Sequence, residues 1–380
     1  MENTNEKENS AVQSQHHEVN LEALTLNPVQ LKDLSLKGII GDKQTFIAFK
    51  DPKSYLVGTY GYEINLFESG RELFCYELDE DDNKLWDIVY APAPLNCYFL
   101  ASLTHLYRKD INKEDPKQLL PIESGTSAGA SLRYSTKHQR LIVNAGSKNI
   151  VVINPETNDV EIEVQKSIGD EIRDFQLLGK NEDKVVAITP SGYVILYHLD
   201  YTKKSGEVVN HLKIDLIEER REYLTKLAID SKNEHLLIDV QRLNPFICSR
   251  LLVLKISGTE LVLKTALDQT TKSIKSKSAL ECLGYSGTNI AFIGLTQYTK
   301  GSMDELPVED YGGSSYLGSI IPEAGIAQIY VYNIESEELR ELDDKRVSHG
   351  EYKPTNLHRV DGKFYYTGHN GKLMILKQSY

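Results

Sequence analysis

The sequence contains few cysteines, and they are not arranged as metal ligands. The cysteines are Cys75, Cys97, Cys248 and Cys282, which are scattered along the chain without a CxxC pair. Zinc sites need ligands at short, regular spacing, and disulfide-stabilised domains need dense sets of cysteines. The pattern therefore argues against both, and we expect buried thiols in a reducing compartment. With only 3 methionines, a plastic, methionine-lined binding groove is also disfavoured.

The sequence also lacks an excess of positive charge and any long apolar run. Its formal net charge is −12, whereas nucleic-acid binders usually carry a basic field that neutralises phosphates. No stretch approaches the ~18 apolar residues of a membrane span. The first twenty residues have no apolar segment and no arginine, unlike secretory or mitochondrial targeting peptides. We expect no nucleic-acid partner, no membrane association and a cytoplasmic or nuclear location.

Motifs of covalent catalysis are missing as well. The sequence contains no GxSxG nucleophile elbow and no P-loop, and its histidines do not recur at the spacing of metal ligands. We therefore expect that the protein is not an enzyme and needs no cofactor.

What the sequence does contain is a short polar tail followed by a strand-rich domain. Residues 1–25 are mostly polar and charged, so they bury too little apolar surface to offset the entropy of ordering, and we expect a disordered tail. From Val29 onward, short runs of Val, Ile, Leu, Tyr and Phe alternate with Gly, Ser, Asn and Asp. Such punctuation is typical of all-β proteins. Residues 26–380 are expected to form one β domain.

Three apolar runs recur along this domain at intervals of roughly forty residues or more. The first run of each unit is centred on an apolar residue, and these residues are Ile47, Ile88, Leu132, Phe175, Leu227, Leu283 and Leu357. A second and a third run follow each of them. Ser191-Gly192 separates a second from a third strand, and Ser257-Gly258 joins a third to a fourth strand. Units of four strands at this spacing predict a seven-bladed β-propeller. A pair of stacked β-sandwiches is the alternative.

The two ends of the chain complement each other in this arrangement. The seventh unit lacks a fourth strand because the chain stops at Tyr380, and the strand-like run Val29–Leu36 precedes the first unit. Pairing this run with the last unit removes an exposed sheet edge. We therefore predict a propeller closed by an N-terminal strand that completes the last blade.

One unit resembles a known family of propellers. In Arg140–Val160, a strand that ends in Asn144, Gly146 and Ser147 is followed by a strand that ends in Asn154 and Thr157. This pattern resembles a blade of the YVTN-type propellers, whose consecutive tight turns use glycine and Asx-turn chemistry.

The unit length and the closure resemble the WD-repeat family. Its hallmark dipeptides do not fall at their usual places, because Gly368-His369 lies between second and third strands and Trp86-Asp87 in a first strand. The resemblance implies the propeller superfamily and no particular function.

Two regions are candidates for a site. In the first strands, Asp87, Asp174 and Glu281 face the central channel beside Arg173 and Lys226. Converging acids can bind a metal or act as general acid and base, so a lactonase-like or small-ligand-binding channel is one hypothesis.

The second region is a set of loops expected on one face of the fifth and sixth units. The long insertion Tyr298–Gly325 mixes acids with tyrosines, Gln241–Ser249 is apolar, and Gln269–Lys277 is basic. Long loops in compact domains are usually functional or disordered, and apolar patches rimmed by charge bind proteins. The predicted partner-binding residues are Leu243, Phe246, Ile247, Lys272, Lys275, Tyr311, Tyr316 and Ile320. The leading hypothesis is a non-catalytic scaffold that mediates protein–protein interactions within a multiprotein assembly.

Overall fold

The described part of the chain consists of strands, hairpins and short connections. A computed structural model describes residues 25–33, 45–59, 63–69, 71–77, 85–102, 104–113, 115–121, 130–145, 149–165, 168, 171–215, 222–230, 232–242, 248–267, 278–285, 290–298, 325–341, 354–360, 363–368 and 372–379. Among these residues the strands form seven antiparallel sheets of four strands each. The prediction of an all-β fold is confirmed. No helix in this part of the chain is long and apolar enough to cross a membrane.

The first four sheets follow one another along the chain. Sheet 1 comprises β2 (Thr45–Asp51), β3 (Ser54–Thr59), β4 (Glu63–Glu68) and β5 (Arg71–Glu77). Sheet 2 comprises β6 (Asp87–Ala91), β7 (Cys97–Ala101), β8 (His105–Asp110) and β9 (Lys117–Pro121). Sheet 3 comprises β10 (Ala130–Ser135), β11 (Arg140–Ala145), β12 (Asn149–Ile153) and β13 (Val160–Gln165). Sheet 4 comprises β14 (Asp174–Leu178), β15 (Lys184–Ile188), β16 (Tyr193–Asp200) and β17 (Ser205–Lys213).

The last three sheets include one strand from the other end of the chain. Sheet 5 comprises β18 (Glu222–Ile229), β19 (His235–Arg242), β20 (Cys248–Ser257) and β21 (Glu260–Leu267). Sheet 6 comprises β22 (Ser278–Tyr285), β23 (Ile290–Tyr298), β24 (Gly325–Asn333) and β25 (Glu338–Glu341). Sheet 7 comprises β26 (Pro354–Val360), β27 (Lys363–Gly368), β28 (Lys372–Ser379) and, at its edge, β1 (Thr25–Asp33).

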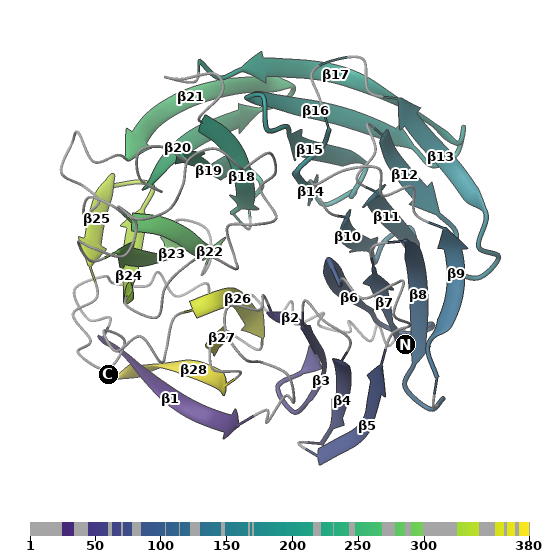
Figure 1. Ribbon diagram of the computed structural model, residues 1–380. Coiled ribbons are helices and arrows are strands. Elements are labelled where there is room, and N and C mark those ends of the chain that lie inside the picture. The colour runs from purple at the N-terminus through teal and green to yellow at the C-terminus, as the bar shows by residue number, and fades with distance from the viewer. Residues whose placement is uncertain are drawn as a thin grey trace, which may run out of the picture.

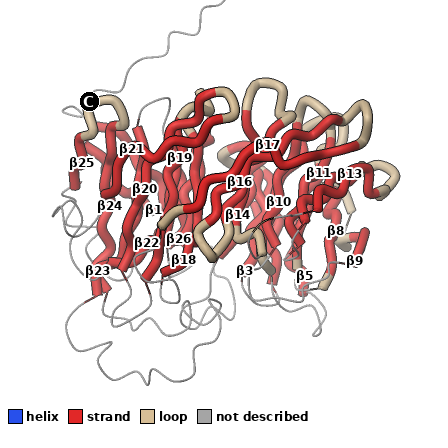
Figure 2. The backbone as a smooth tube through the Cα atoms, turned by 90° about the horizontal axis from the view of Figure 1, so that it is seen from above, coloured by secondary structure: helices blue, strands red, loops and turns tan. Residues whose placement is uncertain are grey.

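The sheets stand around a common centre, with the first strand of each sheet innermost (Figure 1). Each innermost strand contacts that of the next sheet, and β26 contacts β2. Seen from the side, the hairpins connect the strands at the two rims of this arrangement (Figure 2). The apolar residues on which the repeat was recognised, from Ile47 to Leu357, all lie in innermost strands.

Strand position within a sheet decides the burial pattern. The second strand β7, CYFLA, is buried at every residue because neighbouring sheets cover both of its faces. The outer strand β17, SGEVVNHLK, alternates between exposed and half-buried residues because one of its faces meets water. This difference explains why Cys97–Ala101 reads as a continuous apolar run in the sequence, whereas Ser205–Lys213 does not.

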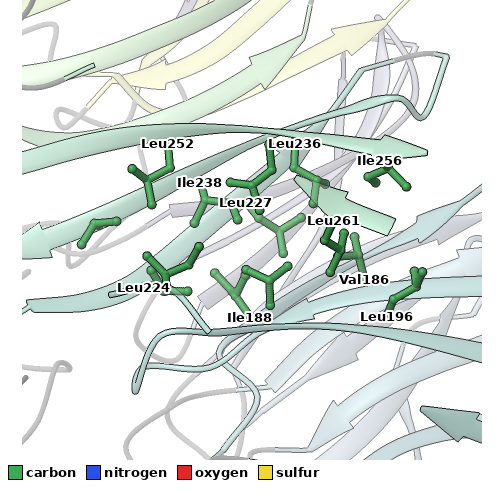
Figure 3. Packing of buried hydrophobic residues seen from close by; sticks show 14 of the residues in the cluster. Val186, Ile188, Leu196, Leu224, Leu227, Leu236, Ile238, Leu252, Ile256 and Leu261 are labelled. Atoms are coloured by element: carbon green, nitrogen blue, oxygen red, sulfur yellow. The ribbon is translucent and has the colours of Figure 1, made fainter. Parts of the chain in front are cut away.

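The core lies between sheets and not within one layer. Figure 3 shows one of these interfaces, where side chains of sheets 4 and 5 interdigitate. Val186 and Ile188 of β15 pack with Leu236 and Ile238 of β19, and all four are fully buried. Burying each such side chain contributes about 1.5–3 kcal/mol. The contacts between neighbouring sheets therefore hold the arrangement together.

The third-to-fourth hairpins of sheets 3, 4 and 6 share a turn that the sequence showed clearly in only one unit. Asn154 accepts a hydrogen bond from the Glu156 N–H at 3.0 Å, and the Thr157 hydroxyl accepts one from the Asp159 N–H at 3.4 Å. The Asx-turn chemistry predicted for Asn154 is confirmed, whereas Gly146 and Ser147 lie outside the described residues. Asp200 and Asn333 accept N–H groups in the same way in sheets 4 and 6.

The N-terminal strand starts earlier than expected. β1 begins at Thr25 and pairs antiparallel with β28, with Val29 opposite Ile375. The predicted strand is correct over residues 29–33, and residues 34–36 lie outside the described part of the chain. Pro28 has no backbone N–H to donate, and it is tolerated because β1 is an edge strand, where one side of the strand needs no partner.

Candidate functional site

The predicted partner-binding residues do not fall in the described part of the chain. Leu243, Phe246, Ile247, Lys272, Lys275, Tyr311, Tyr316 and Ile320 all lie outside it. Their role stays a prediction. The strands that carry their loops are described, however, and these strands fix where the loops leave the sheets.

The apolar loop is shorter than predicted. Gln241 and Arg242 belong to β19 and pair with Ser249 and Cys248 of β20, so the loop narrows to residues 243–247. The larger insertion begins and ends where it was expected, because Tyr298 of β23 pairs with Gly325 of β24. Both loops connect the second and third strands of their sheets.

The basic segment runs between the same ends of the same two sheets. The last residue of β21, Leu267, lies opposite Leu251 near the start of β20. The first residue of β22, Ser278, lies opposite Gln297 near the end of β23. Residues 268–277 therefore connect the loop-bearing end of sheet 5 to the loop-bearing end of sheet 6. We call the three segments 243–247, 268–277 and 299–324 the loop face.

A buried ion pair joins the first and third strands of sheet 5. Arg250 of β20 donates a hydrogen bond to Glu222 of β18 at 3.1 Å, and only 5% of the Glu222 side chain is exposed. Thr225 donates its hydroxyl proton to the buried Asp239 nearby. These contacts tie the first three strands of the sheet together.

The channel acids have a clear structural arrangement. Arg133 of β10 donates to Asp87 of β6 at 3.1 Å and to Asp174 of β14 at 3.0 Å. One guanidinium thereby links sheets 2, 3 and 4. Arg133 also donates to the Gln176 side-chain oxygen at 3.0 Å and lies over the Phe175 ring at 5.4 Å.

The same carboxylates also accept backbone N–H groups of the next sheet. Asp87 accepts from Leu132 at 2.9 Å, and Asp174 accepts from Leu227 at 3.1 Å. Each carboxylate further accepts the N–H of the residue that follows it. A carboxylate offers about four acceptor positions, so most of this capacity is used. The acids tie sheet 2 to sheet 3 and sheet 4 to sheet 5.

This arrangement bears on the hypothesis of an active channel. Burial raises the pKa of Asp87, and Arg133 together with the N–H groups of Leu132 and Ile88 opposes that rise. Asp87 and Asp174 do converge, but on a guanidinium. Glu281 lies in β22, and its side chain is outside the described set. Among the described residues, no three His, Cys, Asp or Glu side chains gather as metal ligands would.

The residue that organises the channel network was missed in the sequence. The candidates Asp87 and Asp174 precede the central apolar residues of their strands, whereas Arg133 and Gln176 follow theirs. Side chains alternate along a strand, so residues i−1 and i+1 point to the same face. Applied to Leu132 and Phe175, that rule would have placed Ser131 with Arg133 and Asp174 with Gln176.

Cys97 is buried, as expected for a structural thiol. Burial raises the pKa of Cys97 to about 11, so the thiol stays protonated near neutral pH and is a poor nucleophile.

Comparison with solved structures identifies the fold. The crystal structure of the WD40 β-propeller domain of Doa1 matches with a TM-score of 0.58 and 11% sequence identity, over 94% of this chain and 98% of that chain. In all, 1282 solved chains match, so the likeness indicates a common architecture and no single function. No family model matches the sequence. No curated protein matches it either.

Proposed function

We propose that this chain, which has the fold of a WD40-type β-propeller, is a non-catalytic scaffold that binds a protein partner through the loop face. In this proposal the seven sheets are seven blades, and β1 closes the ring by completing the last blade. Propellers of this type commonly serve as platforms for protein interaction.

The contacts between the two ends of the domain support closure. β1 pairs with β28 along most of its length, and β26 contacts β2. The Tyr365 ring of β27 lies 5.2 Å from the Phe49 ring of β2, within a cluster that includes Tyr55 and Phe67. Aromatic packing of this kind favours contact between sheet 7 and sheet 1.

The observation that carries the interaction proposal is the placement of three elaborated segments at one end of two neighbouring sheets. Residues 243–247, 268–277 and 299–324 all start or end on strands of sheets 5 and 6 at that end. Their composition combines apolar anchors with both signs of charge, which suits a protein interface with an apolar centre and a polar rim. The described channel acids, by contrast, are engaged in ties between sheets.

A pull-down tests the loop face. A variant that lacks residues 300–323 and carries Phe246→Ala is expected to lose the partners that the wild-type chain captures. An aromatic anchor at an interface contributes roughly 2 kcal/mol or more, and removal of the insertion adds to that loss. The measurement is quantitative mass spectrometry of proteins co-purified with each chain.

The matched control is Lys203→Ala, which changes an exposed residue in the β16–β17 hairpin of sheet 4. It is expected to retain every partner. Recovery of the same partners by the deletion variant, folded to the same melting temperature, would show that the loop face is not the binding site.

A further inference from the structure

A pocket of about 430 Å³ opens between sheets 4 and 5, away from the loop face. Three hairpins form it: the β14–β15 turn, the β18–β19 turn and the β20–β21 turn. These turns connect first to second or third to fourth strands. In an antiparallel sheet such turns lie at the opposite strand ends from the second-to-third loops. The pocket therefore lies at the opposite end of the strands from those at which the segments of the loop face leave sheets 5 and 6.

The pocket is positively charged in a protein of net charge −12. Lys184, Lys232 and Lys255 line it together with a single acid, Glu234. Lys184 donates to the Gly258 carbonyl at 3.4 Å, which places its ammonium group across the gap between the two sheets. Lys232 and Lys255 are exposed, and their ammonium groups form no hydrogen bond or ion pair with another described residue. Their charges are available to a ligand.

The hairpins that carry these lysines are held in place. Asn233, between Lys232 and Glu234, has a φ of 58°, and Gly258 has a φ of 66°. Asp230 accepts the N–H groups of Glu234 at 2.7 Å and His235 at 3.1 Å, which fixes the β18–β19 turn. A pocket whose frame exists before binding loses little entropy when a ligand arrives.

The floor of the pocket is apolar and continuous with the core. Leu178 and Ile256 line it, and both belong to the buried cluster between sheets 4 and 5. Ile256 lies at one end of that cluster in Figure 3. The pocket thus offers a carbon-rich base beneath a rim of ammonium groups.

We propose that this pocket binds a phosphate monoester. Three lysines and one glutamate carry a formal charge of +2, which matches the charge of about −1.5 to −2 on a phosphate monoester at neutral pH. Lysine ammonium groups bind phosphate as point charges, and this pocket presents lysines and no arginine. The apolar floor suits the organic part of the ester. The volume of the pocket falls within the range of about 300–1,000 Å³ that is usual for ligand pockets.

The ester has two sources, a free metabolite or a phosphorylated side chain of a protein, and the test separates them. Isothermal titration of the full chain uses glycerol 3-phosphate as one probe and a phosphoserine peptide as the other, with the unphosphorylated peptide as reference. Saturable binding of a phosphorylated probe, absent with the reference peptide and weakened by added salt, is expected. Tighter binding of the peptide by about tenfold or more assigns a protein source; equal or tighter binding of glycerol 3-phosphate assigns a metabolite.

Lysine variants tie that binding to the pocket. Lys232→Ala combined with Lys255→Ala is expected to weaken binding by about tenfold or more, because two charge-assisted contacts are lost. Lys180→Ala, an exposed lysine of the β14–β15 turn that does not line the pocket, is expected to bind as wild type does. The substituted residues Lys180, Lys232 and Lys255 are exposed, so these variants are expected to fold as the wild type does. The melting temperature of each variant checks this. Absence of binding by both probes, or unchanged affinity in the double variant, overturns the proposal.

Discussion

Removal of residues 1–33, which include β1, is expected to destabilise the whole domain, because β1 pairs with the last strand, β28. Without β1, sheet 7 keeps only β26, β27 and β28, and β28 becomes an unpaired edge. An exposed edge strand is a template for pairing with another chain. Domain stability totals about 5–15 kcal/mol, so loss of a paired nine-residue strand removes a large share of it. We expect a strongly lowered melting temperature and concentration-dependent association.

Thermal denaturation with size-exclusion chromatography measures both effects. The matched control removes residues 1–20 only and keeps β1, and it is expected to melt within a degree or two of the full chain. A chain that starts at residue 34, stays monomeric and melts as the wild type does would mean that β1 does not close the domain.

Substitution of Arg133 is expected to have the second largest effect. Arg133→Met keeps a side chain of similar length over Phe175 but leaves Asp87 and Asp174 facing each other without a cation. Breaking a buried charge pair by removing one partner costs about 3–5 kcal/mol. The exposed fractions here are 23% for Arg133, 24% for Asp87 and 16% for Asp174, so water screens part of this cost. We expect a loss near the lower limit, about 3 kcal/mol.

The loss is also expected to depend on pH. The folded-state pKa of Asp87 is raised by burial, and loss of Arg133 raises it further. A raised pKa means that the folded state prefers the protonated acid, so this destabilisation is fully present above the folded pKa and fades as pH falls below it. Urea denaturation at about pH 7 and about pH 5 is expected to show a smaller deficit at the lower pH.

Two further variants complete that experiment. Arg133→Met combined with Asp87→Asn and Asp174→Asn is expected to recover part of the stability, because no uncompensated charge remains. Arg71→Met, at an exposed position of β5, is expected to change stability by less than about 0.5 kcal/mol. Wild-type stability in Arg133→Met would show that the channel network is not a structural tie, and the hypothesis of an active channel would regain support.

The sequence predicted the strands well because burial imposes a repeated pattern. Phe99-Leu100 and Val185-Val186 lie in second strands, which are covered on both faces and so read as continuous apolar runs. Turns were harder to predict. Ser69, after β4, adopts a φ of 52°, a left-handed conformation that glycine favours and serine disfavours.

The channel network could not have been predicted as a whole. Its members come from three sheets, and the contact between Arg133 and Asp174 spans residues far apart in the chain. Strand periodicity indicates the face on which a side chain lies, but not which side chain of the next sheet it meets. The basic pocket was missed for the same reason, because Lys184 and Lys255 come together only when sheets 4 and 5 pack.

The proposed closure of the ring by β1 is tested most directly by a designed disulfide. Leu26 lies opposite Gln378 in the β1–β28 pair, and directly opposed residues in antiparallel strands have Cβ atoms about 4.5–5.5 Å apart. Leu26→Cys with Gln378→Cys is therefore predicted to form a disulfide within one chain on mild oxidation, identified by peptide mass spectrometry. In the control, Leu26→Cys with Met374→Cys, the second cysteine lies four residues from the partner of Leu26, about 13 Å along β28. This control is predicted to form no disulfide. Equal cross-linking in both variants, or none in either, would contradict closure by the N-terminal strand.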